Sequence, residues 1–273
     1  MVRILEKKRL NKETVLFKFY LPEIAQRAQP GQFIIVRVEE EGERIPLTIA
    51  DFHPEEGSVE VVVQEAGATT KLLAHKKAGE EISGVSGPLG NPVSLEEGKR
   101  VVCVGGGVGI ACVYPVARAF KEKGNDLISI IGARTKGLII FEKRMREISR
   151  RLLVATEDGS YGRKGTVVEV LREYLAKEKV DLVFVVGPAI MMQKVAMTTY
   201  PLRIPTQASL NPLMVDGTGM CGACRVKVGG KRKFACVDGP HFDAHQVDFE
   251  ELIARQKSYQ KEEKERLRVI GYA

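Results

Sequence analysis

The stretch Val101–Gly109 reads VVCVGGGVG and is followed directly by IACVYPVARAFKEKG. The β-branched run is typical of a buried strand, and the apolar spacing of the next residues predicts an amphipathic helix. Glycines between a strand and a helix let the backbone turn sharply and approach a phosphate, which N–H groups at the helix start can bind. We therefore predict a nucleotide-binding turn at Gly105, Gly106, Gly107 and Gly109, although many turns of this kind carry glycine for packing alone.

This turn departs from the G-x-G-x-x-G pattern of dinucleotide-binding proteins. Ile110 stands where the pattern has its last glycine, and Asp126 precedes the second strand rather than ending it. That strand ends at Arg134-Thr135-Lys136, whose charges either meet the 2′-phosphate of NADP or are solvated, so the choice between NAD and NADP stays open. A later strand ends at Gly187-Pro188, a second turn at the sheet edge where ligands bind.

Strand and helix patterns alternate on both sides of the glycine turn. The runs RVVCVGG, DLISIIGA, RLLVATE and DLVFVVG alternate with helical stretches such as TVVEVLREYLAKEK. This alternation predicts a parallel, doubly wound sheet with helices on both faces. We assign residues 100–205 to an NAD(P)-binding α/β domain, in which Cys103 and Cys112 are packing residues.

The residues that precede this domain, 1–99, read as short strands separated by Pro and Gly turns. TVLFKFYL, GQFIIVRVE and SVEVVVQE predict a small antiparallel β-barrel with one short helix near Thr69–Lys76. Two motifs stand out: RIPLTI at 44–49 starts a strand, and GATTK at 67–71 opens the helix, where N–H groups and hydroxyls gather. Taken alone, an Arg near a Pro is usually an ordinary surface residue.

Residues 206–245 form a Gly- and Cys-rich finger, and a helical tail follows at 246–273. Two thiolates spaced as Cys221 and Cys224 can share a metal, and Cys236 supplies a third. A plant-type [2Fe–2S] site uses C-x4-C-x2-C and a distant fourth cysteine. Asp216 stands where that motif has its first cysteine, so we predict a cluster bound by Asp216, Cys221, Cys224 and Cys236.

Three alternatives to an iron–sulfur cluster remain open at this point. A structural zinc could be bound by the three cysteines of the finger and His241. The cysteines could be buried thiols, although the glycines and polar flanks make a poor core. The Cys-x-x-Cys pair could exchange disulfides, but a thioredoxin-like βαβ context is missing.

Composition excludes several classes of protein. The 273 residues are 44% hydrophobic, which is typical of a globular chain of about two domains and an appendage. The net charge of +7, from 42 basic and 35 acidic residues, is spread among acidic neighbours, so we expect no nucleic-acid partner. No apolar run is long enough to span a membrane, and the charged start MVRILEKKRL is unlike a signal peptide, so we expect a cytoplasmic protein.

The order of these motifs resembles the ferredoxin–NADP reductase superfamily, in which a flavin-binding barrel precedes a pyridine-nucleotide domain. The resemblance implies that Arg44 contacts the flavin diphosphate and that Pro46, Leu47 and Thr48 lie along the isoalloxazine ring. It also implies a pyrophosphate cap at the helix start. The residues of that cap are Gly67, Thr69 and Thr70.

With its C-terminal finger, the chain resembles the electron-transfer subunits of dihydroorotate dehydrogenase and their relatives. The stretch from Cys236, CVDGPHF, resembles the family's Cys-x-Asp-Gly-Pro-x-Phe. Asp216 and the stretch SLNPLMVDGTGMCGAC resemble the small subunit of NADH-dependent ferredoxin–NADP oxidoreductases, also known as sulfide dehydrogenase. This branch implies FAD, a [2Fe–2S] cluster and NAD(P)H as cofactors. Its implied partner is a larger flavin and iron–sulfur subunit, in a bifurcating heterodimer that reaches ferredoxin through that partner.

The combined motifs predict hydride exchange between NAD(P)H and FAD and single-electron exchange with the cluster. The cofactors carry this chemistry, so we predict no general acid or base. The alternatives are a dihydroorotate dehydrogenase subunit, a stand-alone ferredoxin reductase, and a zinc-containing binding module without redox activity. Tyr272 resembles the terminal aromatic of plant-type reductases, but it follows an extra finger and helix, so we expect it at the surface.

Overall fold

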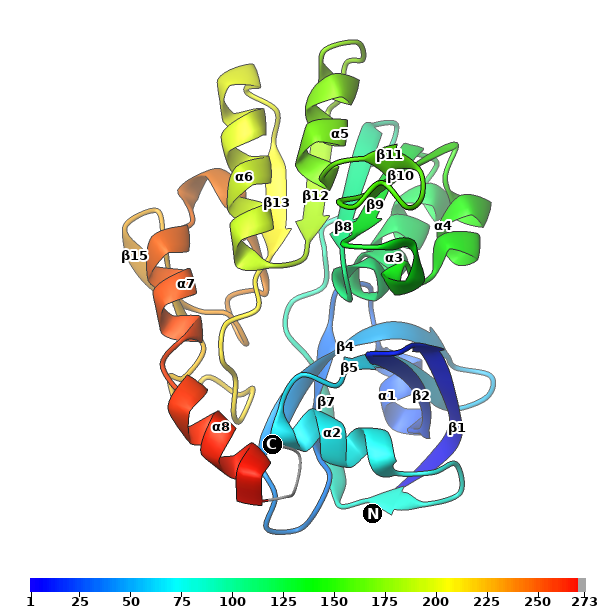
Figure 1. The fold of residues 1–273 in the computed structure, drawn as a ribbon, viewed down its shortest axis with the longest axis vertical. Helices are drawn as coiled ribbons and strands as arrows, with labels where there is room; N and C mark the ends of the chain where they lie inside the picture. Colours follow the sequence, from blue (N-terminus) through cyan, green and yellow to red (C-terminus); the bar gives the residue numbers. More distant parts are fainter. Residues whose placement is uncertain (270–273) are drawn as a thin grey trace.

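The computed structural model describes residues 1–269, and Figure 1 shows three parts. An α/β part lies above a barrel, and a C-terminal segment, coloured orange to red, runs along one side of both. Across the described residues no helix combines the length and apolar character needed to cross a membrane. The expectation for Tyr272 falls outside the described range.

The barrel is a seven-stranded antiparallel sheet with the order β6-β1-β2-β5-β4-β3-β7. Alternate residues of each strand face inward, so that Phe17 and Phe19 pack on Ile34 and Val36 in its core. The antiparallel barrel is thereby confirmed, and a short helix, α1, was not expected. The elements are β1 Val2–Asn11, β2 Thr14–Tyr20, α1 Pro22–Arg27, β3 Phe33–Arg37, β4 Arg44–His53, β5 Ser58–Gln64, α2 Ala68–His75, β6 Glu81–Ile82 and β7 Gly84–Leu89.

The α/β part is a second seven-stranded sheet with the order β11-β10-β9-β8-β12-β13-β16. Its strands from β11 to β13 run parallel, whereas β16 pairs antiparallel with β13. Helices α3 and α4 cover one face and α5 and α6 the other, as the doubly wound prediction requires. The elements are β8 Arg100–Gly106, α3 Gly109–Glu122, β9 Asp126–Ala133, α4 Glu142–Ile148, β10 Arg151–Thr156, β11 Arg163–Lys164, α5 Val167–Leu175, β12 Leu182–Val186, α6 Ala189–Thr199, β13 Thr206–Ser209 and β16 His241–Asp243.

Strand β8 is the point at which the order of strand addition reverses in the α/β sheet. The chain first adds β9 and β10 on one side of β8 and then returns to add β12 and β13 on the other. The turns that follow β8 and β12 therefore lie side by side at the carboxyl edge, which is where ligands bind in doubly wound sheets.

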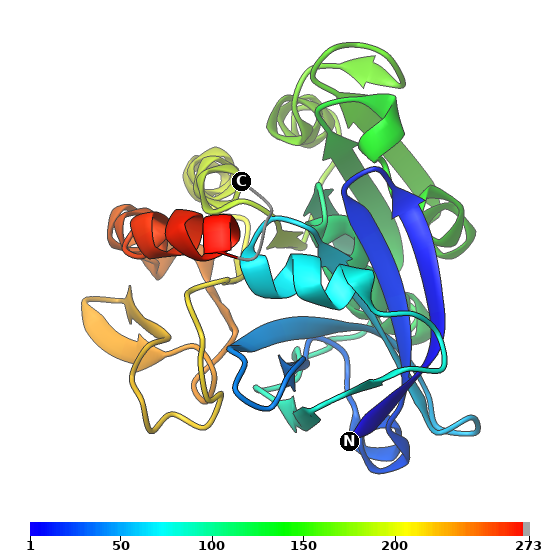
Figure 2. The ribbon, with the colours of Figure 1, turned by 60° about the horizontal axis from the view of Figure 1, so that its bottom comes forward.

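The cysteine-bearing stretch of the C-terminal segment is anchored in the α/β sheet at both of its ends. Strands β13 and β16 join that sheet, and between them a glycine-rich loop leads into a hairpin of β14, Arg225–Val228, and β15, Lys231–Phe234. The tail is two helices, α7 Phe249–Gln256 and α8 Gln260–Val269. Helix α7 buries Phe249 and Leu252, while α8 is exposed and contacts α2, as Figure 2 shows.

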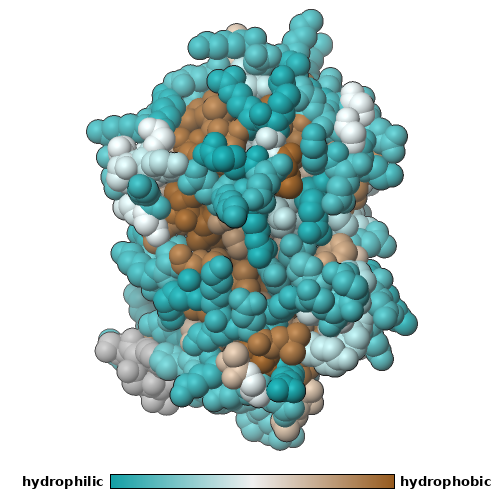
Figure 3. All heavy atoms as spheres, turned by 90° about the vertical axis from the view of Figure 1, so that its right-hand side faces the viewer, coloured by the Kyte–Doolittle hydropathy of each residue, from teal (hydrophilic) through white to brown (hydrophobic). Residues whose placement is uncertain are grey.

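The barrel and the α/β part share one apolar core. Leu16, Ala50 and Val62 of the barrel belong to the same buried cluster as Ile110 and Val113 of α3. Figure 3 views the side that carries β1 and α4, where apolar side chains form a band from the α/β part toward the barrel. The two parts are therefore joined by hydrophobic contact as well as by the chain.

Candidate functional site

A cleft of about 510 Å³ lies between the barrel and the carboxyl edge of the α/β sheet. It brings together seven residues that the sequence predicts for cofactor binding, from strands or turns far apart in the chain. These are Thr48, Gly106, Gly107, Gly109, Arg134, Gly187 and Pro188.

The glycine turn after β8 is shaped by close backbone contact. Gly107 has a φ of +58° and donates its N–H to the carbonyl of Gly132, a conformation that favours glycine. A Cβ on Gly109 would lie 2.6 Å from the carbonyl oxygen of Val186, so a larger residue would separate α3 from β12. No side chain caps the first turn of α3, and the N–H groups of Ile110 and Ala111 already donate to the carbonyls of Gly107 and Val108, so this turn attracts an anion chiefly through the helix dipole.

The second turn, Gly187-Pro188, closes the same edge of the cleft. Pro188 precedes the first residue of α6, and its carbonyl accepts the N–H of Met191 at 2.8 Å. The Met191 side chain lies against Gly106 and Gly187, where an added Cβ would meet its sulfur or terminal methyl. The two glycine turns are thus held against each other by one methionine.

Strand β4 presents its motif in strict alternation. Ile45, Leu47 and Ile49 face the barrel core, so Arg44, Pro46 and Thr48 share the other face. Leu47 is thereby placed with its side chain in the core, and only its backbone faces the cleft side. Thr48 lies beside Cys112, whose thiol donates to the carbonyl of Val108 at 3.9 Å, and burial raises the pKa of that thiol.

The start of α2 holds the second barrel motif. The N–H of Gly67 donates to the Thr70 hydroxyl at 2.9 Å, and the Thr69 hydroxyl donates to Glu43 at 2.6 Å. The carboxylate of Glu263, from α8, lies against Gly67. Two carboxylates therefore stand where the resemblance implies a diphosphate.

Arg134 lies at the rim of the cleft, where β9 meets the barrel. Its guanidinium is two-thirds exposed and lies 3.4 Å from the Glu13 carboxylate, at the turn between β1 and β2. Lys136 points elsewhere, with its ammonium 5.1 Å from the centre of the Tyr161 ring. Of the two cations in this turn, Arg134 is the one that lines the cleft.

Sequence reasoning missed several residues that line the cleft. Ser209 ends β13, and Leu210 and Asn211 follow it, so the rule that ligands bind at carboxyl ends of parallel strands could have found them. No comparable pattern marks the barrel residues, because they reach the cleft only through the fold. Those are Asn11, Glu13, Thr14 and Gln64.

The four predicted cluster ligands form two pairs. The Cys224 and Cys236 thiols lie 3.1 Å apart and are buried, and burial beside Cys224 raises the pKa of Cys236 to about 12. Asp216 and Cys221 lie nearer the surface, where the Asp216 carboxylate accepts the Cys221 N–H at 3.0 Å. The N–H of Thr218 also donates to Asp216 and lowers the pKa of this carboxyl.

The cysteine loop packs on the barrel as closely as backbone allows. Gly217 has a φ of +75°, and a Cβ there would come within 2.7 Å of Leu89 and 2.9 Å of Ile35. Ile35 pairs with Pro46 across β3 and β4. The loop therefore lies one strand away from the strand that carries the flavin motif.

His241 is engaged away from the cysteines. Its Nε2 lies 3.1 Å from the carbonyl oxygen of Gly31, and its ring packs on Phe184. Burial lowers the pKa of His241 to about 4. Among residues 1–269, no group of three possible metal ligands that includes a cysteine converges within 4.8 Å, as a single zinc ion would require.

Three family models match successive parts of the chain. An oxidoreductase FAD-binding domain matches residues 1–93, and an oxidoreductase NAD-binding domain matches residues 103–197. The iron–sulfur cluster binding domain of dihydroorotate dehydrogenase B matches residues 211–248. The chain thus contains binding domains for FAD, a nicotinamide nucleotide and an iron–sulfur cluster.

Relatives match nearly the whole chain. An electron-transfer subunit homolog of dihydroorotate dehydrogenase B (NAD(+)) from Thermotoga maritima is 48% identical over 96% of this chain and 92% of its own length. The electron-transfer subunit of dihydroorotate dehydrogenase B from Desulforamulus reducens is 31% identical over 87% of this chain and 93% of its own. Both relatives are named as electron-transfer subunits.

Solved structures agree with this relationship. A structure of NADH-dependent reduced ferredoxin-NADP oxidoreductase superposes with a TM-score of 0.94 and 45% identity, covering 99% of this chain and 98% of the other. A ferredoxin NADP+ reductase from Neisseria gonorrhoeae shares the fold at a TM-score of 0.61 and 19% identity, over 74% of this chain and 90% of its own. The chain therefore belongs to the family of electron-transfer subunits of the dihydroorotate dehydrogenase B type, and it is an NAD(P)H-dependent oxidoreductase subunit.

Proposed function

We propose that the chain passes electrons between NAD(P)H, FAD and a [2Fe–2S] cluster within a heteromeric NADH-dependent ferredoxin–NADP oxidoreductase. The observation that carries this proposal is the cleft that gathers Thr48 and both glycine turns, with the Asp216–Cys221 loop packed one strand away. When bound, FAD exchanges two electrons with a nicotinamide and one at a time with an iron–sulfur cluster. No catalytic acid or base is needed, so the residues of the chain bind the cofactors, orient them and shield them from solvent.

The flavin would be held by the outward face of β4 and the start of α2. Arg44 offers a charge to a diphosphate, while Pro46, the Leu47 backbone and Thr48 offer a surface for the ring. Gly67, Thr69 and Thr70 offer N–H and hydroxyl groups at the helix start. Glu43 and Glu263 now occupy this position, so a bound diphosphate displaces both carboxylates.

The nicotinamide nucleotide would be held at the switch point of the α/β sheet. Gly107 leaves open space for a phosphate beside the start of α3, Gly106 and Gly109 line the same turn, and Gly187 and Pro188 lie next to them at the same edge. Gly105 lies behind the turn, where a Cβ would meet Ile110 at 3.0 Å. Arg134 offers a charge at the rim to NADP, and a comparison of NADH with NADPH as reductant tests that role.

The cluster would be held by Asp216 and Cys221 on its outer side and by Cys224 and Cys236 on its inner side. Among residues 1–269, the Cys224 and Cys236 thiols lie together, but no third donor converges on them as a single tetrahedral ion requires. This argues against the zinc-binding module. An aspartate oxygen is a harder donor than a thiolate, so Asp216 would tune the potential of a cluster held here.

Anaerobic purification of the full chain tests the cofactor set. We expect about one FAD, two iron and two acid-labile sulfide per chain, with visible absorbance from both groups. Stopped-flow mixing with NADH or NADPH should then bleach the flavin band before the cluster band. Zinc without iron, or a chain that binds no flavin in the presence of excess FAD, would contradict the proposal.

The second candidate, a dihydroorotate dehydrogenase subunit, is favoured by the names of several relatives. The two candidates differ in the larger subunit, which carries further flavin and iron–sulfur centres in the first and forms orotate in the second. Affinity purification of the tagged chain from its native cell, followed by assays with dihydroorotate and with reduced ferredoxin plus NADP, separates them. Full ferredoxin reductase activity of the isolated chain would instead favour the stand-alone enzyme.

A further inference from the structure

Strand β4 and helix α3 touch at two polar points along their length. At one point Thr48 meets Cys112, and at the other the Asp51 carboxylate accepts the Arg118 guanidinium at 2.6 Å. Six helical residues from Cys112 to Arg118 advance about 9 Å. Three strand residues from Thr48 to Asp51 advance about 10 Å. Because these spacings match, both contacts form in a single register of α3 along β4.

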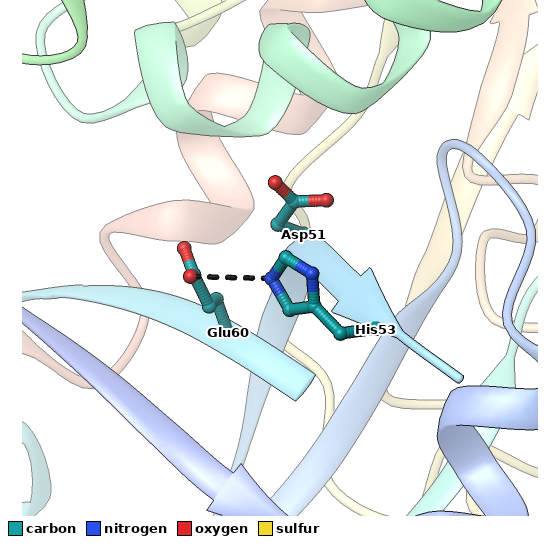
Figure 4. A group of neighbouring side chains, drawn as sticks. All are labelled: Asp51, His53 and Glu60. Carbon is teal, nitrogen blue, oxygen red and sulfur yellow. Dashed lines mark hydrogen bonds and ion pairs between the residues drawn. The ribbon is translucent and has the colours of Figure 1, made fainter. Parts of the chain in front are cut away.

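The second contact belongs to a buried group of charges. The pairing of β4 with β5 shifts at a bulge between Ile49 and Asp51, and this shift places Asp51 opposite Glu60. The two residues are 4% and 7% exposed. Figure 4 shows both carboxylates beside His53, whose Nε2 lies 3.4 Å from Glu60. Two like charges placed opposite each other are destabilising unless cations balance them.

The α/β part supplies those cations. Arg118 of α3 binds Asp51, and Arg144 of α4 donates to Glu60 at 2.7 Å while lying 3.7 Å from Asp51. Both guanidiniums lie 5.7 Å from the centre of the Tyr114 ring. The carboxylates are thus already paired, which disfavours a metal ion, and both ion pairs cross from the barrel to the α/β part.

We infer that this charge group positions the two halves of the redox cleft by fixing the register of α3 on β4. The same helix that carries Arg118 begins at Gly109 in the glycine turn, and the same strand that carries Asp51 carries Thr48 in the flavin motif. Sliding α3 along β4 would move the nucleotide site relative to the flavin site. The charged residues touch neither site themselves, so Asp51, Glu60, Arg118 and Arg144 are positioning residues. The expected effect on flavin reduction rests on the proposed function, whereas the register of α3 on β4 does not depend on it.

The kinetic test uses the full-length holoprotein. Asp51→Asn/Arg118→Met removes one pair without leaving a lone buried charge, and Arg118→Lys keeps the charge. We expect the double variant to keep its FAD and to reduce flavin about tenfold or more slowly at saturating NAD(P)H, because small displacements of reacting groups are costly. The nucleotide concentration for half-maximal rate should change less than about twofold, and the lysine variant should recover part of the rate.

The matched control is Arg163→Met, which breaks an exposed ion pair with Glu173 inside the α/β part. It should leave the rate unchanged. A double variant as fast as the wild type, or a control equally slow, would overturn the inference.

A geometric test separates this inference from the proposed function. Dyes attached through non-canonical side chains at positions 8 and 177, both exposed, report the distance between the barrel and the α/β part. We expect a broader distance distribution in the double variant and an unchanged one in the Arg163→Met control. If the wild type is not reduced by either nucleotide, the proposed function fails, yet these distances still decide the register. An unchanged distance distribution in the double variant would refute the role of the charge group in fixing the register, whatever the rates of flavin reduction.

Discussion

Two of the seams that join the barrel to the rest of the chain differ in their polar content. The seam between β4 and α3 contains buried charges, in which Asp51 and Arg118 pair across the boundary. The seam between the barrel and the cysteine loop is apolar and close, with Gly217 against Ile35 and Leu89. At the first seam, ion pairs fix the register of α3 along β4. At the second seam, steric fit fixes the distance between the cysteine loop and the barrel.

The difference matches the demands on each seam. Hydride exchange requires two groups to be oriented, and directional ion pairs provide orientation. Electron exchange requires two groups to be near, and a glycine contact provides the closest approach that a backbone permits. Substitutions in the cysteine loop, and in the nearby contact of β16 with the barrel, test this difference.

The largest expected effect is loss of the cluster itself. Cys224→Ser should remove nearly all iron and acid-labile sulfide, because Cys224 and Cys236 form the buried pair. Cys112→Ser lies outside the loop and should keep the full complement. Iron and sulfide assays of both variants check this, and iron retained at wild-type level in Cys224→Ser would remove that residue from the ligand set.

Acid should loosen the contact of β16 with the barrel. Burial lowers the pKa of His241 to about 4, so its imidazole is neutral in the folded chain. The unfolded chain takes up a proton below about pH 6.5, which favours unfolding as the pH falls from about 6.5 to 4. We expect a loss of about 2 kcal/mol in unfolding free energy between pH 7.5 and 5 from this residue.

Urea unfolding at the two pH values measures this loss. His241→Phe should flatten the dependence by that amount, while His75→Gln, on the barrel surface, should keep it. Equal slopes in the wild type and in His241→Phe would contradict the assignment.

Alanine substitutions at Gly217 and Gly79 separate the cost of a steric clash at the apolar seam from the cost of backbone strain. Gly217→Ala should cost about 2 kcal/mol, because a left-handed φ and the contact with Leu89 and Ile35 both oppose a Cβ. Gly79 has a similar φ of +88° but no atom within 4 Å of the added Cβ, so Gly79→Ala should cost only about 1 kcal/mol. Thermal unfolding of both variants checks the difference, and equal costs would show that the seam is loosely packed.

The smallest expected effect concerns the outer ligand. Asp216→Cys should keep the cluster but move its midpoint potential by roughly 50 mV, because a thiolate replaces a harder oxygen donor. Redox titration followed by electron paramagnetic resonance measures the shift. Asp216→Ala is the matched variant and should lower cluster content instead. An unchanged potential and spectrum in Asp216→Cys would exclude the aspartate as a ligand.

Local patterns made much of this molecule predictable. The glycine turn at 105–109 and the alternating strands around it are encoded in short windows, and the structure confirms the doubly wound sheet they predict. The spacing of Cys221 and Cys224 likewise predicts a metal-binding loop from four residues. Such features depend on neighbours in sequence, which a single chain displays directly.

Contacts across long separations could not be read in the same way. Asp51 and Arg118 are 67 residues apart, and each looks like an ordinary surface charge until the bulge in β4 turns the carboxylate toward α3. His241 has the spacing of a zinc ligand, yet the carbonyl of Gly31, 210 residues earlier, holds it in place. Within the predicted helical tail, α7 buries Phe249 and Leu252 against partners that only the fold brings near.

The pairing of β13 with β16 makes the cysteine-bearing stretch a cassette inserted at one edge of the α/β sheet. Ser209 and His241 are partners in that antiparallel pair, so residues 210–240 leave and rejoin the sheet at adjacent points. Replacing the cassette with a two-residue turn would leave a simple β-hairpin, whose closure costs little entropy. The cassette also buries Leu210, Met214 and Val226 in the core of the α/β part, so its removal would expose that core to solvent.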